Sequence, residues 1–451
     1  MLTAIADDSA TLISDLRMRE FSRLDEQRHT YLDYTGSALY GTSQLRFHHA
    51  LLEQSVFGNP HSDSAPSRDS TAVIAAARRT VLRFLGVDES THTVCFTANA
   101  TAAIKLVAES YPFGPQSPLI LSADNHNSVN GIREYARRAG ARVRVLPLDG
   151  ALRLRDPEMI LDHEAREGRG LLAFPAQSNF SGVQHPLELV TKARALGMEV
   201  LLDIAAYAPS HALSLRACPA DFAVLSFYKL FGYPTGVGAL VARREALARL
   251  RRPWFSGGTV LWASTALGTH RLRGTEEAFE DGTPNFLGVA ALTPGFALIE
   301  EVQMPRLTDH VRRLTFTLLA GLRALRHRNG MPLVRLYGPH DLTARGGTVA
   351  FNVCDRTGTP VPYADVETRA RTLEVSLRGG CFCNPGASEA AFDLEPDRTA
   401  ACLEESGAAF TPERLAACTG RSVGAVRASV GLANNEADIR RALEVIASFA
   451  V

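Results

Sequence analysis

The chain has 451 residues, of which 46% are hydrophobic and 21% charged, and its formal net charge is +0. This composition is typical of a globular protein with two or three domains. The balanced charge argues against binding to nucleic acid or to an anionic membrane surface. No apolar run approaches the roughly 20 residues of a membrane-spanning helix, and the first residues lack the basic start and long apolar core of a signal peptide. We therefore expect a cytoplasmic protein.

Short apolar runs alternate with helix-like segments from about residue 94 to residue 241. Seven runs predict strands: residues 93–97, 118–122, 141–147, 170–175, 198–203, 222–227 and 236–242. The alternation predicts an α/β fold whose mainly parallel, seven-stranded sheet is covered on both faces. Ligands of parallel sheets lie beyond the carboxyl ends of the strands, so residues just after these runs are the candidates for chemistry.

The pattern changes after residue 304. A long helical stretch at 306–330 leads into a strand-like run at 346–353, and a helical pattern at 435–449 ends the chain. We predict a large domain over 31–304 and a smaller α+β domain formed by 1–30 and 305–451.

Lysine is rare in this chain. Only Lys105, Lys192 and Lys229 are present among 48 basic side chains, and the rest are arginine, which stays protonated. Lys105 and Lys192 fall in amphipathic helical patterns and are interpreted as solvated. Lys229 follows a predicted strand and has aromatic neighbours, which favours burial over a surface salt bridge. Burial lowers the pKa of an amine and suits it to Schiff-base chemistry.

Three other residues lie at the end of a predicted strand or shortly after one. Asp203 fits either a helix cap or the partner of a protonated ring nitrogen, as in pyridoxal phosphate (PLP). Thr101 begins a helical pattern, where it fits either an ordinary N-cap or a phosphate site at a helix N-terminus. His126 fits either a structural hydrogen bond or stacking on a flat cofactor ring.

A glycine-flanked segment, "SLRGGCFCNPG", contains Cys381 and Cys383 beside Arg378. The glycines indicate an unusual backbone, and an adjacent arginine favours a thiolate. The alternatives are two incidental buried thiols or a metal site, although the spacing to Cys402 and Cys418 is poor for zinc. Seven cysteines in a long chain favour reduced thiols over a disulfide framework.

Motifs of several other enzyme classes are absent from the sequence. It contains no G-x-S-x-G, no H-E-x-x-H, no P-loop and no G-x-G-x-x-G followed by a helix. Their absence disfavours a hydrolase, a metalloprotease, a nucleotide triphosphatase and a nicotinamide-dependent enzyme.

Taken together, the motifs resemble a known family. They are "YLDYTGSALYG", "FGNPHSDS", "FTANATAAIKLVAE", "DNHNSVNGIREYA", "SFYKLFGYPTGVGALV", "FEDGTPNF", "RGGCFCNPGA" and "GAVRASVGLANNEAD". The chain resembles the class V aminotransferases, fold-type I enzymes that use PLP, and within them the cysteine desulfurases. The longest motifs are most similar to the desulfurase-like domain of molybdenum-cofactor sulfurases.

The resemblance implies how PLP would be held. Lys229 would form a Schiff base with it, Asp203 would pair with its pyridine nitrogen, and His126 would stack on its ring. The remaining cofactor-binding residues implied are Ala100 (through its amide), Thr101, Ser226, Tyr228, Asn179 and, from the partner subunit of a homodimer, Thr283.

The resemblance also implies the substrate site. Arg427, with Arg378 nearby, would bind the carboxylate of L-cysteine, and Asn179 would lie near the substrate. Lys229 would move the Cα proton, and the Cys383 thiolate would take the sulfur as a persulfide and release alanine. No metal is implied.

The sequence departs from the simpler desulfurases at two positions. Ala206 stands where they have a glutamine, and Tyr228 stands where they have a histidine; both changes resemble the molybdenum-cofactor branch. Fused members of that branch carry a further cofactor-binding domain, which these 451 residues do not include. The sulfur acceptor therefore stays open: a separate protein, a small molecule, or a biosynthetic pathway that needs sulfur.

Two other function classes stay open. One keeps PLP but is a C–S lyase, a selenocysteine lyase or an aminotransferase acting on another amino acid, for which Cys383 need not be a persulfide carrier. The other is a non-enzymatic scaffold, which intact Lys229, Asp203 and Cys383 disfavour. The sequence also leaves open whether Cys381 assists or replaces Cys383.

Overall fold

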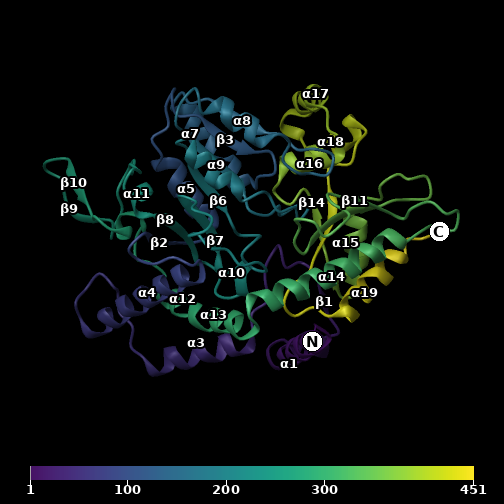
Figure 1. The fold of residues 1–451 in the computed structure, drawn as a ribbon, viewed down its shortest axis with the longest axis horizontal. Helices are drawn as coiled ribbons and strands as arrows, with labels where there is room; N and C mark the ends of the chain where they lie inside the picture. Colours follow the sequence, from purple (N-terminus) through teal and green to yellow (C-terminus); the bar gives the residue numbers. More distant parts are fainter. Residues whose placement is uncertain (1) are drawn as a thin grey trace.

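A seven-stranded sheet forms the centre of the larger part of the molecule (Figure 1). The computed structural model describes the backbone of residues 2–451 and the side chains of residues 11–451. The strands are β2 (His92–Thr97), β3 (Leu119–Ser122), β4 (Val143–Leu146), β5 (Leu171–Pro175), β6 (Glu199–Asp203), β7 (Phe222–Ser226) and β8 (Gly238–Arg243). Their order is β2-β8-β7-β6-β5-β3-β4, and only β8 runs against its neighbours. The predicted mainly parallel, seven-stranded sheet is confirmed.

Helices cover both faces of this sheet because alternate strand residues point to opposite sides. In β5, Leu171 and Ala173 pack in one hydrophobic cluster with the helices α5 (Ala100–Ser110) and α7 (Ile132–Arg138). Leu172 and Phe174 pack in another with α4 (Ala65–Phe84) and α9 (Glu188–Ala195). Full burial on both faces explains why these strands are continuous apolar runs.

The other elements around the large sheet are short helices and one hairpin. The helices are α3 (Thr42–Gln54), α6 (Asn127–Asn130), α8 (Pro157–Glu164), α10 (Phe227–Phe231), α11 (Arg244–Leu247), η1 (Glu276–Phe279), α12 (Phe286–Ala290) and α13 (Leu292–Val302). The hairpin of β9 (Val260–Ser264) and β10 (Thr269–Leu272) extends to the far left of Figure 1, away from the sheet.

The smaller part contains a four-stranded antiparallel sheet in the order β11-β12-β15-β14. Its strands are β11 (Val334–Tyr337), β12 (Thr348–Val353), β14 (Arg378–Gly380) and β15 (Ala425–Ser429), and β1 (Thr30–Tyr31) pairs separately with β13 (Val375–Ser376). The helices of this part are α1 (Leu2–Glu20), α2 (Arg23–Glu26), α14 (Met304–Ala324), α15 (Tyr363–Thr372), α16 (Pro385–Phe392), α17 (Pro396–Ser406), η2 (Gly407–Ala409), α18 (Pro412–Thr419) and α19 (Glu436–Ala447).

The long helix α14 buries one side. Its apolar residues recur every three or four positions (Leu307, Val311, Leu314, Leu318 and Leu322), so they form one stripe against the small sheet. The sequence pattern predicted a helix as far as residue 330. The helix ends at Ala324 because the next residues turn into a short antiparallel bridge between Arg326 and Pro332.

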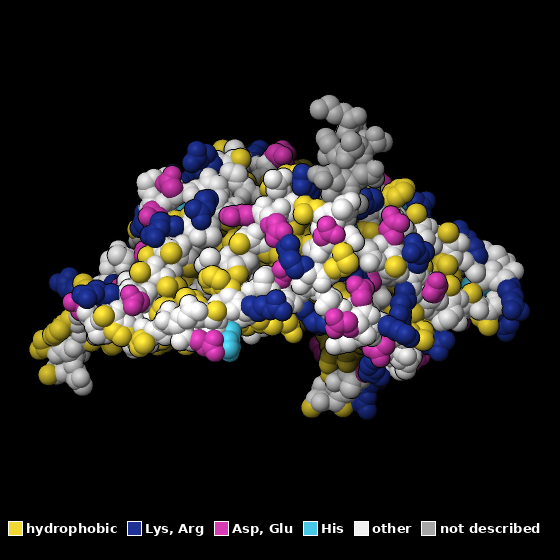
Figure 2. Space-filling model, turned by 90° about the horizontal axis from the view of Figure 1, so that it is seen from below, with side chains coloured by type: hydrophobic (Ala, Val, Ile, Leu, Met, Phe, Trp, Pro, Cys, Tyr) yellow, Lys and Arg dark blue, Asp and Glu magenta, His cyan; other side chains and the backbone are white. Residues whose placement is uncertain are grey.

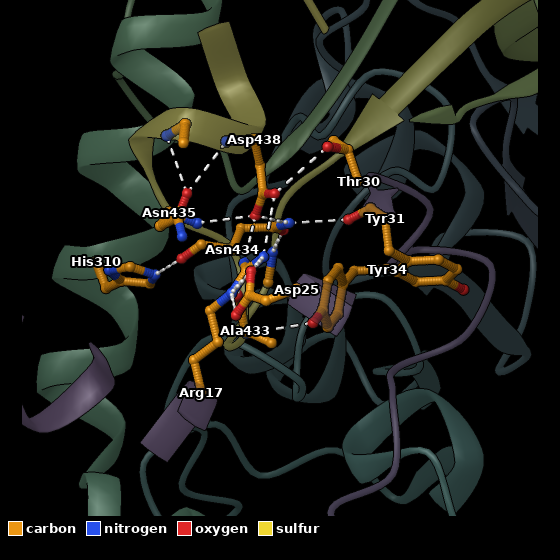
Figure 3. Close-up of polar contacts among 12 residues, drawn as sticks. Arg17, Asp25, Thr30, Tyr31, Tyr34, His310, Ala433, Asn434, Asn435 and Asp438 are labelled. Carbon is orange, nitrogen blue, oxygen red and sulfur yellow. Dashed lines mark hydrogen bonds and ion pairs between the residues drawn. The ribbon is translucent and has the colours of Figure 1, made fainter. Parts of the chain in front are cut away.

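The N-terminal segment packs on the small part through a buried polar network (Figure 3). Arg17 forms ion pairs with Asp438 (2.6 Å) and Asp25 (2.7 Å). Leu16 and Phe21 enter the same hydrophobic cluster as α14 and α19. The domain boundaries near residues 30 and 304 stay a prediction.

Within residues 2–451, no single helix is both long and apolar enough to cross a membrane. The segment Phe286–Val302, which spans α12 and α13, meets those criteria only together with α14, from which it is bent by 73°.

Candidate active site

The carboxyl ends of three neighbouring strands meet at one cavity. Asp203 ends β6, Ser226 ends β7, and Pro175 ends β5 in register with Asp203. The cavity has a volume of about 170 Å³. It is lined by Asn99, Ala100, Thr101, Ile104, His126, Ser128, Pro175, Gln177, Asn179, Asp203, Ala205, Ala206, Ser226, Tyr228 and Lys229. Eight predicted site residues therefore come together: Ala100, Thr101, His126, Asn179, Asp203, Ser226, Tyr228 and Lys229.

Lys229 lies in α10, directly after β7. Burial lowers the pKa of its amine, and the charges of Arg427 and Arg378 lower it further, whereas Asp203 acts in the opposite direction. Within residues 11–451, no hydrogen bond engages this amine. A lowered pKa favours the neutral, nucleophilic form of the amine, which is the form that Schiff-base formation requires. Lys105 and Lys192 instead form ion pairs with Glu109 and Asp162, and their side chains are 60% and 33% exposed, so both are in contact with solvent.

The N-terminus of α5 forms one end of the cavity. Asn99 caps the helix by accepting a hydrogen bond from the Ala102 amide at 3.0 Å. A side chain at Gly238 would lie 2.5 Å from the Asn99 backbone, so only glycine permits this close approach of β8. The site therefore combines a helix N-terminus with hydroxyl groups, which is a suitable site for a phosphate.

The predicted phosphate ligands already have hydrogen-bond partners at this end of the cavity. The Ala100 amide donates to Ser226 Oγ at 2.8 Å, so it is engaged inside the protein. The Thr101 hydroxyl lies 2.7 Å from Ser128 Oγ, and Ser128 is a residue that the sequence analysis missed.

His126 is the N-cap of α6. Its Nδ1 accepts a hydrogen bond from the Ser128 amide at 3.1 Å. Burial lowers the pKa of His126, and Lys229 lowers it further, whereas Asp203 raises it. A neutral, flat ring on the cavity wall is compatible with stacking on a cofactor ring.

Asp203 is the only carboxylate among the cavity residues. Its Oδ1 accepts a hydrogen bond from the Ala205 amide at 2.9 Å, which fixes the side chain at the strand end. A carboxylate held there is the group that a pyridinium nitrogen needs. Together with the helix N-terminus and the Lys229 amine, it makes the cavity fit PLP.

The two predicted carboxylate-binding arginines lie beside the cavity without lining it. Arg378 and Arg427 stand opposite each other on β14 and β15, and both form ion pairs with Asp33. Arg427 also donates to the Asn179 carbonyl at 2.8 Å. Asp33 was missed by the sequence analysis, although it lies in the quoted "YLDYTGS" motif.

Cys381 and Cys383 belong to a tight turn. The Asn384 amide donates to the Cys381 carbonyl at 3.0 Å, and Phe382 and Cys383 have φ values of 56° and 55°. Two successive non-glycine residues in the left-handed region cost on the order of 1–2 kcal/mol each. Both thiols are exposed, because Phe382 takes the buried place between them.

Four hydrogen bonds attach this turn to the large part of the molecule, one of them from Asn384 Nδ2 to Asn179 Oδ1 at 3.0 Å. The Asn127 amide donates to the Cys383 carbonyl at 2.7 Å, and Asn179 Nδ2 donates to the Phe382 carbonyl at 2.7 Å. Asn384 Nδ2 donates to the buried Asp124 at 2.6 Å, and Asp124 also pairs with His185 at 2.9 Å. Because Asn127 follows His126 and Asn179 lines the cavity, the thiol turn is fixed at the edge of the cavity. The sequence analysis missed Asp124, Asn384 and His185.

Thr283 lies apart from these residues. It lines a neighbouring cavity of about 320 Å³ and accepts a hydrogen bond from Asn59 Nδ2 at 3.3 Å. Its assignment to the phosphate of a partner subunit stays a prediction.

The expectation that the cysteines are reduced is wrong for one pair. Cys402 of α17 and Cys418 of α18 form a disulfide, with 5.9 Å between their Cα atoms. The two helices pack side by side, which brings together residues 16 positions apart in the sequence. The other five cysteines are free.

A family model described as aminotransferase class-V matches residues 30–442. The chain belongs to this family. It is 35% identical to the molybdenum cofactor sulfurase of Arabidopsis thaliana over 98% of this chain and 59% of that protein. The chain thus spans somewhat under three fifths of the curated relatives it matches.

Solved structures show the same fold. A cysteine desulfurase from Thermococcus onnurineus NA1 superposes with a TM-score of 0.78 at 23% identity, over 97% of this chain and 98% of that one. A C-DES variant with glycine covalently linked to its PLP cofactor superposes with a TM-score of 0.71 at 18% identity, over 96% and 99%. These likenesses confirm the fold-type I architecture predicted from the sequence.

Proposed function

We propose that this chain is a PLP-dependent cysteine desulfurase that takes sulfur from L-cysteine and passes it to an acceptor. The observation that carries this proposal is the pairing of an unengaged, buried lysine amine with an exposed thiol turn fixed at the edge of the same cavity. The 35% identity to a molybdenum cofactor sulfurase over nearly the whole chain supports the same reaction class.

The residues that would hold PLP are those of the cavity. Lys229 would carry it, Asp203 would pair with its ring nitrogen, His126 would stack on its ring, and the α5 N-terminus would receive its phosphate. When bound, PLP supplies an electron sink for the charge that develops at the substrate Cα.

The chain's own residues then act on L-cysteine in a defined order. The arginine pair binds the carboxylate, and the Lys229 amine takes the proton from Cα. The Cys383 thiolate attacks the substrate sulfur, so that an S–S bond forms while the C–S bond of the substrate breaks. The thiol proton of the substrate moves to Cβ and Lys229 returns its proton to Cα, which together complete alanine. The sulfur remains on Cys383 as a persulfide. Exposure of Cys383 allows the persulfide to meet an acceptor.

We also propose a homodimer, in which Thr283 reaches the phosphate site of the partner subunit. The hairpin β9–β10 supports association, since its Leu261, Trp262 and Leu267 are 69%, 50% and 69% exposed. Figure 2 shows hydrophobic side chains gathered at the left tip, where this hairpin projects. Exposed apolar groups clustered in this way mark interaction sites.

The remaining assignments are proposals as well. A cytoplasmic location is supported by the five free cysteines and opposed by the Cys402–Cys418 disulfide. The neutral net charge supports a protein that binds neither nucleic acid nor membranes. The acceptor is a protein or a small molecule.

One observation favours a second candidate, a PLP-dependent C–S lyase, selenocysteine lyase or aminotransferase. Cys383 is exposed and is not among the residues that line the cavity. If the turn never carries its thiol to the substrate, the reaction ends in pyruvate and ammonia or in amino-group transfer.

The test measures alanine and sulfide released from L-cysteine by the PLP-loaded protein. We expect alanine from the wild type, loss of at least about 100-fold in Cys383→Ala, and an unchanged cofactor absorbance in that variant. Cys381→Ala is the matched control, since it removes a second exposed thiol from the same turn. Pyruvate instead of alanine, or full activity in Cys383→Ala, would support the second candidate.

A further inference from the structure

Two arginines share one aspartate beside the cavity. Arg427 Nη2 donates to Asp33 Oδ1 at 2.9 Å. Arg378 donates to Asp33 Oδ2 through Nε at 2.9 Å and through Nη2 at 2.5 Å. One carboxylate therefore fixes both of the guanidinium groups predicted to bind the substrate's carboxylate.

The local backbone holds Asp33 in this position. Its carbonyl accepts hydrogen bonds from the Gly36 amide at 2.9 Å and from the Ser37 amide at 3.1 Å. A side chain at Gly36 would lie 2.5 Å from Asp33 Oδ2 and 2.7 Å from Arg378 Nη2. The side chain of Asp33 is only 10% exposed. The two ion pairs are therefore fixed by the surrounding backbone in a largely buried position and differ from mobile ion pairs on the surface.

The cluster keeps unused hydrogen-bond donors. Arg427 Nε is buried and has no hydrogen-bond partner among the described residues. The Arg378 side chain is 50% exposed, so its guanidinium is open to solvent on one side. These donors are left for an incoming carboxylate, since Arg427 Nη2 is engaged by Asp33, Arg427 Nη1 by the Asn179 carbonyl, and Arg378 Nε and Nη2 by Asp33.

The charges of the cluster sum to one positive charge, from two guanidinium groups and one carboxylate. A ligand with a single carboxylate balances that charge. A second negative charge on the ligand would lie beside the buried Arg427–Asp33 ion pair without a compensating cation, which is unfavourable.

We propose that Asp33 is a specificity-determining residue, which restricts the site to amino acids with one negative charge and rejects those with an acidic side chain. The inference rests on the proposed function only in that Arg378 and Arg427 bind the carboxylate of the amino acid. It adds a substrate class to that function: amino acids whose side chain is uncharged, as the thiol of cysteine is.

The test compares two unreactive ligands, L-alanine with one carboxylate and L-aspartate with two. Their Kd values are read from the change in the absorbance spectrum of the PLP-loaded protein. In Asp33→Asn, the ratio of the L-aspartate Kd to the L-alanine Kd should fall about tenfold or more, because the cluster gains a full positive charge.

Asp438→Asn is the matched control. Asp438 is also a buried carboxylate paired with an arginine, Arg17, but it lies on α19 and outside the cavity (Figure 3). Its substitution should leave the ratio unchanged. A ratio in Asp33→Asn that matches this control would overturn the proposal.

Arg378→Gln tests the same idea if Asp33→Asn does not fold, since the side chain of Arg378 is half-exposed. It removes one positive charge, so the ratio of the L-aspartate Kd to the L-alanine Kd should rise, and an unchanged ratio would contradict the proposal.

This ratio of Kd values can be measured whether or not the protein desulfurates L-cysteine. A wild type that makes no alanine would refute the proposed function alone, and unchanged ratios in an active enzyme would refute the role of Asp33 alone.

Discussion

At the scale of single residues, Lys229 differs from the other two lysines in its surroundings. It follows a fully buried strand, so its amine enters the cavity, where burial lowers its pKa. Lys105 and Lys192 lie on helices and form ion pairs with Glu109 and Asp162. A lysine at this strand end is therefore suited to nucleophilic chemistry, whereas a lysine on a helix surface forms an ion pair.

This contrast leads to a prediction for cofactor attachment. Borohydride reduction of the PLP-loaded wild type should add one cofactor mass to the peptide that contains Lys229. Lys229→Ala should lose this covalent addition completely, because no other amine lines the cavity. Peptide mass spectrometry makes the measurement, and Lys192→Ala should keep the addition. An addition that persists in Lys229→Ala would show that a different amine holds the cofactor.

At the scale of elements, α14 carries a buried histidine that links it to the loop before α19. His310 Nε2 lies 3.0 Å from the Asn434 carbonyl, to which it donates (Figure 3). Burial lowers the pKa of His310 from 6.5 to about 4, with a smaller effect from Arg313 in the same direction. The folded protein therefore keeps this ring neutral at pH values where an unfolded chain protonates it.

The consequence is a loss of stability in acid. The contribution of His310 is complete above pH 6.5 and is lost as the pH falls from 6.5 towards 4, because only the unfolded state binds the proton in that range. The shift corresponds to about 3 kcal/mol at most.

His310→Gln keeps a donor for Asn434 and cannot be protonated. We expect its free energy of unfolding, from urea titrations, to fall less between pH 6.5 and pH 4 than that of the wild type. His340→Gln, at an exposed position, serves as the control. Equal acid sensitivity in His310→Gln and the wild type would contradict the prediction.

At the scale of the whole molecule, the thiol turn and the cavity come from different parts of the fold. Asp124, Asn127 and Asn179 of the large part hold a turn that belongs to the small part. A movement of the small part against the large part would therefore break these hydrogen bonds and change the distance between the thiols and the cavity.

The hairpin β9–β10 projects from the large part on the side opposite to the small part, where a second subunit could contact it (Figure 1).

The proposed homodimer can be measured directly. Light scattering should give a mass of twice 48.8 kDa for the wild type. Trp262→Glu combined with Leu261→Glu should shift the mass towards the single chain, because charged groups would be buried at the contact. Met159→Glu is the control, since Met159 is 67% exposed on α8 and away from the hairpin. A wild type that is monomeric would refute the homodimer.

The sequence by itself determined the large sheet and the residues at its strand ends. Short apolar runs that alternate with helical patterns are typical of strands buried on both faces. Chain order places Asp203 and Ser226 at the ends of two such strands and Lys229 shortly after the second. Thr101 and His126 were found in the same way. Motifs of this length also indicated the family, which the family model over residues 30–442 confirms, and they implied the residue roles that stay predictions.

Only the tertiary structure decided how distant segments combine at the site. Asp33 meets Arg378 and Arg427 from some 345 and 394 positions away, and Asn384 meets Asp124 from 260 positions away. The disulfide between Cys402 and Cys418 depends on how two helices pack. Sequence patterns report on neighbours within a strand or a helix, whereas long-range ion pairs form only when chain topology brings separate turns together. The charge balance at the arginine pair is therefore a property of the fold and could not be predicted from the motifs.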